Sequence, residues 1–434
     1  MKEYKLSIIE VLFFTLYIIL PSYFALEISE SLPLITGSRV LLMLLVLFYI
    51  FKNNGKIPLK IFNNNYSKIA FLCYFWLMII TNVYYVPVTN EAVKRICTLI
   101  IEELIVVWII ANIIDNDLKL EQVLKVLTIS SGIVAIITII NVIIGENLFY
   151  KLDTVNRNML MANYSRLGIV RAEAGFGHAV YYGCYCLCML PIAMYLIEHS
   201  NNKIKYIVCF ILNMIGLIIS NSRGSLIIAI MLLTYMFLKK KSIVLKKYLL
   251  GIVFVILLII IVLLVSPTIQ KYINNVGISI IKTFTVDEIE IEGYGDNKSG
   301  ILSRTSQFSQ VKYSLSRNFL FGLGEKAQSR GTLKWFNPYT NKLENSDTFD
   351  VGYFAIACQY GLIGIIAHLF LYSFIIKTVF NRKEKNDNII QLFKYFFVGY
   401  FLMMLSISGV HELFWIFFGL LVAYINIKEK ETCN

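Results

Sequence analysis

The sequence predicts an all-α polytopic membrane protein with about twelve transmembrane helices and one large extracytoplasmic loop. Of its 434 residues, 57% are hydrophobic and only 16% are charged, whereas soluble domains average roughly 45–50% apolar and about 25% charged residues. Many apolar segments reach the roughly 20 residues that a helix needs to cross about 30 Å of hydrocarbon. The longest polar stretch, Pro267 to Gly364, lies late in the chain and interrupts this pattern.

Apolar windows of helical length define the expected spans. We place them at 6–25, 33–51, 69–88, 97–114, 122–144, 177–197, 206–220, 224–238, 248–265, 351–376, 389–406 and 412–427. The first span lacks a short apolar core followed by a small-residue cleavage site. It is therefore expected to be a retained helix and not a signal peptide.

The lysines predict the orientation of these spans. Most of them, including Lys2, Lys5 and Lys428, lie at alternate span ends, which the positive-inside rule places in the cytoplasm. Both termini are then cytoplasmic and the long loop is outside. The expected organisation is helices 1–9 in residues 1–265, an extracytoplasmic loop with short helices in 266–350, and helices 10–12 with a cytoplasmic tail in 351–434.

A turn is expected inside the apolar run from Tyr206 to Leu238, which is too long for one span. The segment Asn221–Gly224 has the residues of a turn between two helices. It carries Arg223, and a charge at membrane depth is costly unless it faces a water-filled cavity with a partner. A functional role is one interpretation of Arg223, and snorkelling to the interface is the other.

Two acidic residues interrupt the fourth predicted span, where a charge is again costly. Glu102 and Glu103 lie a turn or two below Arg95. These residues are predicted to form an ion pair inside the membrane.

The arginines are distributed differently from the lysines. Only Arg382 is clearly cytoplasmic, and the other nine lie outside or near the outer ends of spans: Arg39, Arg95, Arg157, Arg166, Arg171, Arg223, Arg304, Arg317 and Arg330. A guanidinium binds phosphate in a bidentate manner, which an ammonium does not. This surplus indicates a phosphate-bearing ligand at the outer face, although pairing at the surface also explains it.

Arg304 is a candidate because a short helix is expected around it. Ser303 can cap this helix, and Arg304 then shares one face with Phe308, Val311 and Leu315 at spacings of four, seven and eleven residues. Arg304 would therefore lie on the face that docks against the protein.

Further candidates lie in the two polar outer segments. Arg317 lies off the apolar stripe and is either solvated or close to a ligand. Arg166, Arg171 and His178 precede the sixth span, where His178 is either a helix cap or a binding residue. Glu173 could pair with Arg171 at the surface.

Carboxylates mark the return of the chain to the membrane. Asp347 and Asp350 precede the tenth span, where Asp350 could cap the helix or act as a general base toward a hydroxyl group. His411 and Glu412 open the twelfth span on the outer side and allow the same two interpretations.

Taken in order, these segments resemble the O-antigen polymerase and O-antigen ligase family of bacterial membrane glycosyltransferases. The resemblance covers about residues 130 to 410. Its pieces are Arg171 with Phe176–His178 before a span containing Pro191, Ser222–Gly224, Ser303–Arg304 before Gly322–Gly324, and Asp350–Tyr353 before Tyr360–Gly364.

The resemblance implies a fold of the C-type glycosyltransferase kind in the bacterial cytoplasmic membrane. Such enzymes transfer a glycan from undecaprenyl diphosphate to a hydroxyl group of an acceptor glycan, with inversion, and they use neither a nucleotide sugar nor another cofactor. Arg223, Arg304 and Arg171 would hold the diphosphate, and Asp350 or a neighbour would orient or deprotonate the acceptor. Arg166, Arg317, His178, Asp347 and His411 would bind substrate. No metal or nucleic acid is expected, and a chain-length regulator protein is a possible partner.

Three functions that act on the same lipid-linked glycan remain open at this point. The ligase branch usually has a His-Asn pair at the end of the large loop, where this chain has Ser346–Asp347. The polymerase branch for O-antigen or capsule is therefore favoured over a ligase. A flippase for the same lipid is the third alternative, but transporters usually show internal repeats, which we do not find here.

Overall fold

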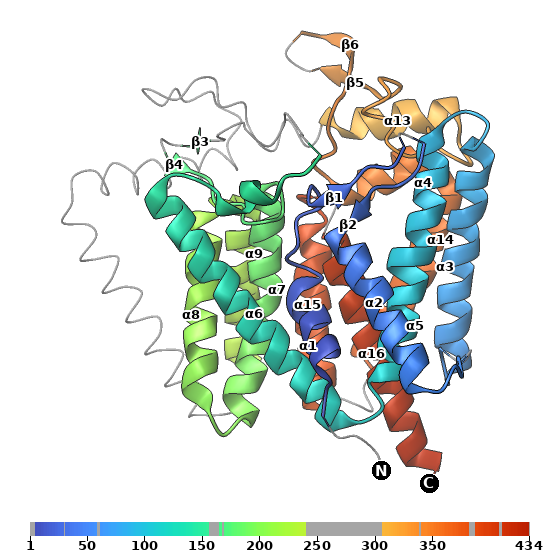
Figure 1. Cartoon of the computed structure of the whole chain (residues 1–434). Coiled ribbons are helices and arrows are strands. Elements are labelled where there is room, and N and C mark those ends of the chain that lie inside the picture. The colour runs from blue at the N-terminus through green and yellow to red at the C-terminus, as the bar shows by residue number, and fades with distance from the viewer. Residues whose placement is uncertain are drawn as a thin grey trace, which may run out of the picture.

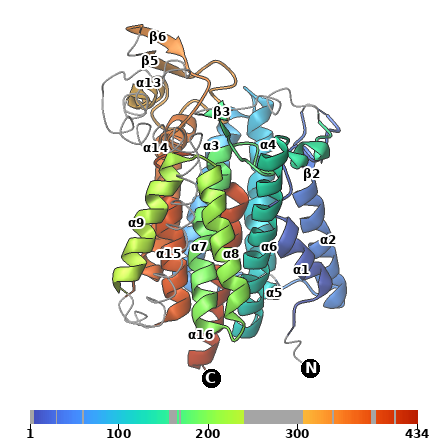
Figure 2. The same ribbon diagram turned by 90° about the vertical axis from the view of Figure 1, so that its left-hand side faces the viewer.

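The computed structural model describes residues 5–29, 31–58, 61–155, 165–166, 169–239, 306–337, 340–381, 387–407 and 410–433. Its helices run roughly along one direction and form a bundle (Figures 1 and 2). The first and last described residues lie at one end of this bundle, and the described part of the late loop covers the opposite end (Figure 1). We call this opposite end the loop end.

The first helix is shorter than its predicted span, 6–25. Helix α1 covers Ile8–Leu16 and begins at a capping box in which Ser7 and Glu10 exchange side-chain to backbone hydrogen bonds. Nine residues of helix measure about 14 Å, which is too short to cross a bilayer. The chain then turns at Pro21, which has no N–H to continue a helix. Strand β1 (Ala25–Leu26) next pairs with β2 (Ile35–Thr36).

The next helices occupy the predicted spans more fully. They are α2 (Gly37–Lys52), α3 (Asn65–Tyr85), α4 (Asn90–Thr98), α5 (Val106–Ile113) and α6 (Asp117–Ile144). A π-helical segment, η1 (Leu99–Ile105), joins α4 to α5 without a break. Such wide turns are rare within helices and are frequent at functional sites.

The middle of the chain supplies the centre of the bundle. A short 3₁₀ helix, η2 (Leu148–Leu152), and the paired strands β3 (Ser165–Arg166) and β4 (Ile169–Val170) lead into α7 (Ala179–His199). Helix α7 is almost wholly buried and packs against α8 (Lys203–Ile219), α9 (Arg223–Lys239) and α15 (Asn388–Met403). The predicted helix break is confirmed, since α8 ends at Ile219 and α9 begins at Arg223. Asn221 supplies the positive φ of this turn.

The described part of the long loop packs onto the start of α14. Helix α13 (Phe308–Arg317) is followed by the hairpin of β5 (Lys334–Asn337) and β6 (Lys342–Asn345). Val311 and Leu315 pack into a small core as predicted, but Phe308 is 60% exposed. Arg304 lies outside the described residues, as do the predicted span 248–265 and the domain boundary at 265.

Helix α14 (Gly352–Val379) is kinked at Gly361, where φ is +60°. At this kink the amide N–H groups of Leu362 and Ile363 donate to the carbonyl groups of Phe319 and Leu320. A Cβ atom at Gly361 would lie 2.6 Å from the Leu320 carbonyl oxygen. The loop and α14 are thus joined backbone to backbone at a position that needs glycine.

Helices α15 (Asn388–Met403) and α16 (His411–Cys433) complete the bundle. They stack aromatic rings across their interface, with the centroids of Phe396 and Phe417 3.8 Å apart. In the described chain, six helical segments are long and apolar enough to cross a membrane: 65–85, 90–113, 117–144, 179–199, 352–379 and 411–431. The predicted count of twelve spans is not confirmed.

Candidate functional site

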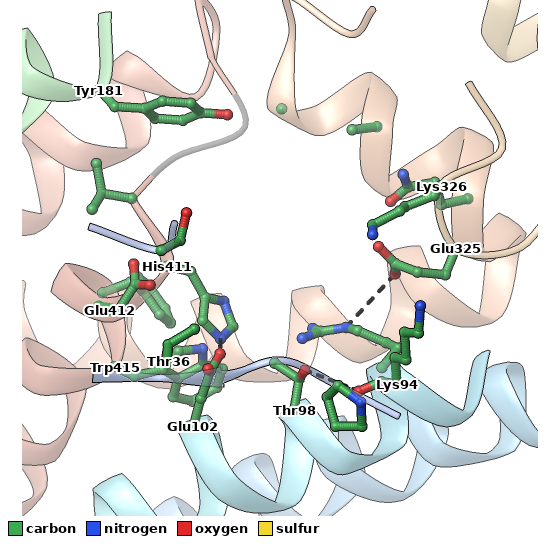
Figure 3. Close-up of a pocket in the computed structure, with 18 of the residues that line it drawn as sticks. Thr36, Lys94, Thr98, Glu102, Tyr181, Glu325, Lys326, His411, Glu412 and Trp415 are labelled. Carbon is green, nitrogen blue, oxygen red and sulfur yellow. Dashed lines mark hydrogen bonds and ion pairs between the residues drawn. The ribbon is translucent and has the colours of Figure 1, made fainter. Parts of the chain in front are cut away.

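A cavity of about 860 Å³ opens at the loop end of the bundle, between α2, α4, α14 and α16 (Figure 3). It is lined by both charged and aromatic residues. The charged ones are Glu27, Arg39, Glu91, Lys94, Arg95, Glu102, Glu325, Lys326, His411 and Glu412. The aromatic ones include Tyr74, Phe176, Tyr181, Tyr360, Tyr372 and Trp415.

Two buried ion pairs form the inner part of the cavity. Arg39 Nε donates to Glu102 Oε1 at 2.7 Å, and Arg95 Nη2 donates to Glu103 Oε1 at 2.8 Å. The hydroxyl group of Tyr74 donates to the other oxygen of Glu103 at 2.9 Å. The predicted ion pair of Arg95 with Glu103 is confirmed, whereas Glu102 pairs with Arg39. Each buried charge thus has the partner that offsets its loss of hydration.

His411 lies directly beside these pairs. Its Nε2 atom is 3.6 Å from Glu102 Oε2 and 3.7 Å from Glu103 Oε1 (Figure 3). Glu412, the next residue of α16, also lines the cavity. The two residues that open the last predicted span therefore belong to the cavity wall.

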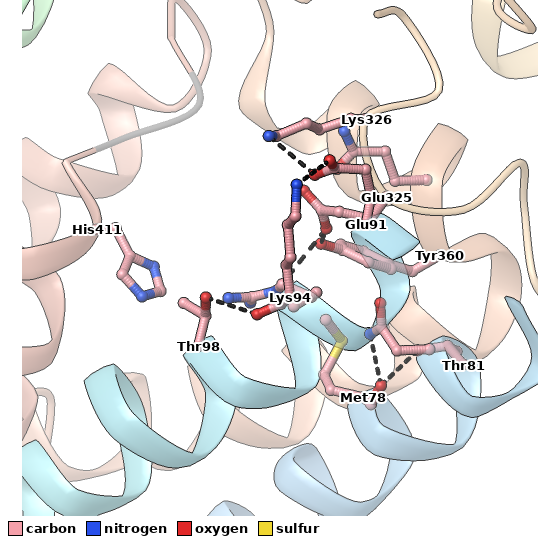
Figure 4. Close-up of polar contacts among 12 residues, drawn as sticks. Met78, Thr81, Glu91, Lys94, Thr98, Glu325, Lys326, Tyr360 and His411 are labelled. Atoms are coloured by element: carbon pink, nitrogen blue, oxygen red, sulfur yellow. Dashed lines mark hydrogen bonds and ion pairs between the residues drawn. The ribbon is translucent and has the colours of Figure 1, made fainter. Parts of the chain in front are cut away.

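A second set of ion pairs ties the late loop to α4 at the rim of the cavity (Figure 4). Glu91 accepts from Lys94 at 3.0 Å and lies 2.9 Å from Lys326 Nζ. Glu325 lies 3.8 Å from Arg95 and accepts a hydrogen bond from the hydroxyl group of Tyr360. Loop residues near 325 thus form one wall of the cavity.

The predicted residue Arg171 contacts the turn between α8 and α9, and Arg223 directly follows this turn. Arg171 Nε donates to the carbonyl oxygen of Ser220 at 3.3 Å, and the N–H of Ala172 donates to Ile219 at 3.1 Å. Arg223 is the first residue of α9 and is partly buried. The loop before α7 therefore docks on the turn that carries Arg223.

Asp350 and His178 join the same region. Asp350 Oδ2 accepts from the side-chain amide of Gln307 at 2.8 Å, and the N–H of Asp350 donates to Gln307 Oε1 at 3.1 Å. His178 caps α7 by accepting from the N–H of Val180. Burial lowers the pKa of His178, the charge of Arg171 lowers it further, and Asp350 opposes both. We call Arg171, His178, Arg223 and Asp350 the junction.

The junction borders the cavity. Phe176, Tyr181 and Gly352, each within a few residues of a junction residue, line the cavity wall. The N–H of Gly352 donates to the carbonyl oxygen of Met404 at 2.8 Å, in the segment that leads to His411. Met404, at the end of α15, thus contacts the start of α14 and also lines the cavity.

Glu173 lies beside the junction in a small hollow of about 40 Å³ that Arg171 and His178 also line. Burial raises the pKa of Glu173 to about 7, and a hydrogen bond from Asn147 opposes this shift. The surface ion pair of Glu173 with Arg171 that the sequence allowed stays a prediction.

Among the described side chains, Arg317 and Asp347 do not line the cavity. Arg317 is exposed, with its guanidinium 5.4 Å from the centre of the Tyr313 ring, and Asp347 is exposed as well. Arg166 lies in β3. The roles assigned to these residues and to Arg304 stay predictions.

Sequence reasoning missed several residues of the cavity. Lys94, Glu325 and Lys326 belong to no motif that singles them out, and Arg39 was one of nine outward arginines without a specific role. The polar position of Arg39 at the start of an apolar span was the one available signal. Its partner Glu102 is 63 residues away, so their pairing is not visible in local patterns.

The fold and the cavity define a membrane protein with a charged, aromatic-lined chamber at the end of a helical bundle. A family model described as O-antigen ligase matches residues 208–369, from α8 into α14. This match confirms the resemblance to the O-antigen polymerase and ligase family, whose members are glycosyltransferase-like enzymes. A comparison with curated proteins finds no match.

Proposed function

We propose that this protein polymerises oligosaccharide repeat units linked to undecaprenyl diphosphate into O-antigen or capsular polysaccharide, at the outer face of the bacterial cytoplasmic membrane. Each step would transfer a glycan from its lipid diphosphate to a hydroxyl group of another lipid-linked glycan. The bilayer and the two lipid-linked glycans are the partners this reaction needs, and a chain-length regulator protein would be a further one.

The observation that carries this proposal is the placement of the junction at the edge of the cavity. Arg171 donates to the turn that directly precedes Arg223, and guanidinium groups bind the oxygens of a diphosphate in a bidentate manner. The adjoining cavity of about 860 Å³ is large enough for sugar rings and has aromatic faces to pack against them. A ligand with a diphosphate at one end and sugars at the other matches both regions.

The two arginines would stabilise the negative charge that develops on the departing diphosphate. Fixed donors of this kind supply a large share of catalysis because they need no reorganisation during the reaction. Asp350, held by Gln307 near His178, would orient the acceptor or remove its proton.

The test uses purified protein in detergent with lipid-linked repeat units, whose products are separated by length. We expect the wild type to produce a ladder of longer glycans. Arg223→Lys keeps the positive charge but loses the planar guanidinium group that binds phosphate in a bidentate manner, so its products should be reduced to single repeats. Arg382→Lys, on the side that the sequence assigns to the cytoplasm, is the matched control and should extend normally. Normal ladders from Arg223→Lys would contradict the proposal.

A ligase is the second candidate, because the matching family model carries that description. A ligase would pass the glycan to a different lipid or to a protein acceptor and would make no ladder from repeat units alone. Transfer that occurs only after such an acceptor is added would identify it. A flippase would change no glycan at all in detergent, where no membrane has to be crossed.

A further inference from the structure

The ion pairs of the cavity leave one inner carboxylate without a basic partner. Among the described residues, Glu102 pairs with Arg39, Glu103 with Arg95, and Glu91 with two lysines. Glu412 lines the same cavity and forms no ion pair with any described residue. Its carboxylate is drawn facing the open space, beside His411 and above Trp415 (Figure 3).

The charge balance of the cavity favours sugars over phosphate there. Five carboxylates and four basic side chains line it, and all four basic groups are already held by carboxylates: Arg39, Lys94, Arg95 and Lys326. A diphosphate would have to displace these carboxylates. Sugar hydroxyl groups can instead donate to carboxylates without disturbing the ion pairs.

Two buried polar atoms near this part of the cavity lack a hydrogen-bond partner among the described residues. One is the hydroxyl group of Tyr17, a side chain that is 1% exposed and directly precedes the cavity-lining residue Ile18. The other is the Nε2 atom of His411, which lies 3.6 and 3.7 Å from carboxylate oxygens of Glu102 and Glu103 and forms no hydrogen bond at those distances. Buried polar atoms are usually satisfied, so these two fit a hydroxyl-bearing ligand.

The chain also brings Glu412 toward the junction. A Cβ atom at Gly224, next to Arg223, would lie 2.8 Å from the side chain of Ser406. The N–H of Gly352 donates to Met404 in the same segment, which continues to His411. The segment that ends α15 thus contacts both the turn of Arg223 and the start of α14, and Glu412 follows six residues after Ser406.

We infer that Glu412 is the base that takes the proton of the acceptor hydroxyl group, which leaves Asp350 the role of orienting the acceptor, with Tyr17 and His411 as positioning residues for the acceptor sugar. This inference rests on the proposed function. The acceptor O–H bond breaks, its proton moves to the Glu412 carboxylate, and the oxygen attacks the anomeric carbon of the donor. The bond from that carbon to the diphosphate oxygen breaks with inversion, and the diphosphate leaves with the electron pair. Glu412 then returns its proton to water.

The test compares three variants of Glu412 in the detergent assay. We expect Glu412→Gln and Glu412→Ala to slow extension by about 10²- to 10⁴-fold. Added formate should restore part of the activity of Glu412→Ala, because it supplies a carboxylate. Glu412→Asp should retain more activity than Glu412→Gln. Glu431→Gln, at the far end of α16 in an exposed ion pair with Lys428, is the matched control and should extend normally.

Two results would overturn the inference. One is extension by Glu412→Gln at close to the wild-type rate, and the other is a loss in Glu412→Ala that formate does not restore although Glu412→Asp folds and extends normally. Either result leaves the polymerase proposal standing when the wild type makes a ladder. A wild type that makes no ladder refutes the proposed function instead.

Discussion

The cavity and the junction hold their charges in different ways. In the cavity, each basic side chain faces a carboxylate at 2.7–3.0 Å, so the charges cancel in place. At the junction, Arg171 donates to the carbonyl oxygen of Ser220, and Asp350 accepts from the amide of Gln307. The contacts just named at the junction are with neutral dipoles, whereas those in the cavity are ion pairs between opposite charges.

The largest effect on stability is expected in the cavity wall. Arg95→Met leaves the Glu103 carboxylate buried without its partner, which typically costs about 3–5 kcal/mol. The double variant Arg95→Met/Glu103→Leu removes both charges and should recover most of that loss. Thermal melting in detergent measures both. A double variant as unstable as the sum of the two single variants would show that the two charges do not act as a pair.

The largest effect on activity without a matching loss of stability is expected at the junction. Arg171→Ala removes a donor for the diphosphate and should slow extension by about 10²- to 10³-fold. Its contact with Ser220 is a hydrogen bond to a neutral carbonyl group, so losing this contact should lower the melting temperature less than losing an ion pair of the cavity wall. The measurement is the rate of glycan extension per folded protein molecule. An Arg171→Ala protein that extends normally would remove Arg171 from donor binding.

A third prediction concerns Gly361, where the late loop packs against α14. Gly361→Ala places a Cβ atom against the Leu320 carbonyl group in a backbone region that costs non-glycine residues about 1–3 kcal/mol. Gly331→Ala is the control, because Gly331 also has a positive φ but open space around it. The melting temperature of Gly361→Ala should fall further. Equal shifts in melting temperature for the two variants would show that the close contact between the loop and α14 does not contribute to stability.

The junction should also respond to pH through Glu173. Its folded-state pKa of about 7 lies above the ordinary value of 4.5, so the folded state binds the proton more tightly than the unfolded state. The stability from this group is complete below pH 4.5 and is lost as the pH rises through about 7. Glu173→Gln should flatten that part of the melting profile. His178 makes stability change with pH in the opposite direction, because its pKa is lowered. A melting profile that is the same in Glu173→Gln as in the wild type would contradict the raised pKa of Glu173.

The smallest effect is expected at the rim. Lys326 is half exposed in its ion pair with Glu91, and such pairs contribute about 0.2–1 kcal/mol. Lys326→Ala should lower the melting temperature slightly, and high salt should reduce the difference. A large loss of stability would mean that the loop depends on this contact far more than its exposure indicates.

The sequence predicted features that depend on neighbouring residues. Apolar windows located most helices, and the turn residues at Asn221 located the break before Arg223. The pair of Arg95 and Glu103 could be predicted because both lie on one continuous helix.

Features that depend on distant residues could not be predicted in this way. Arg39 and Glu102 come from different helices, and Glu325 reaches Arg95 from the late loop. Their contacts arise only when the whole bundle has packed. The early end of α1 was missed because apolar composition continues to Leu26 and outweighed the one local signal, the proline at position 21.

The most direct test of the division between the two regions is the affinity of the protein for undecaprenyl diphosphate without sugars. Arg223→Lys and Arg39→Lys make the same change at the junction and in the cavity, and only the first should matter. We expect Arg223→Lys to raise Kd by about tenfold or more, since a lysine cannot replace the guanidinium fork, and Arg39→Lys to change it by less than about twofold. A larger rise in Kd for Arg39→Lys than for Arg223→Lys would place the diphosphate in the cavity and contradict the account.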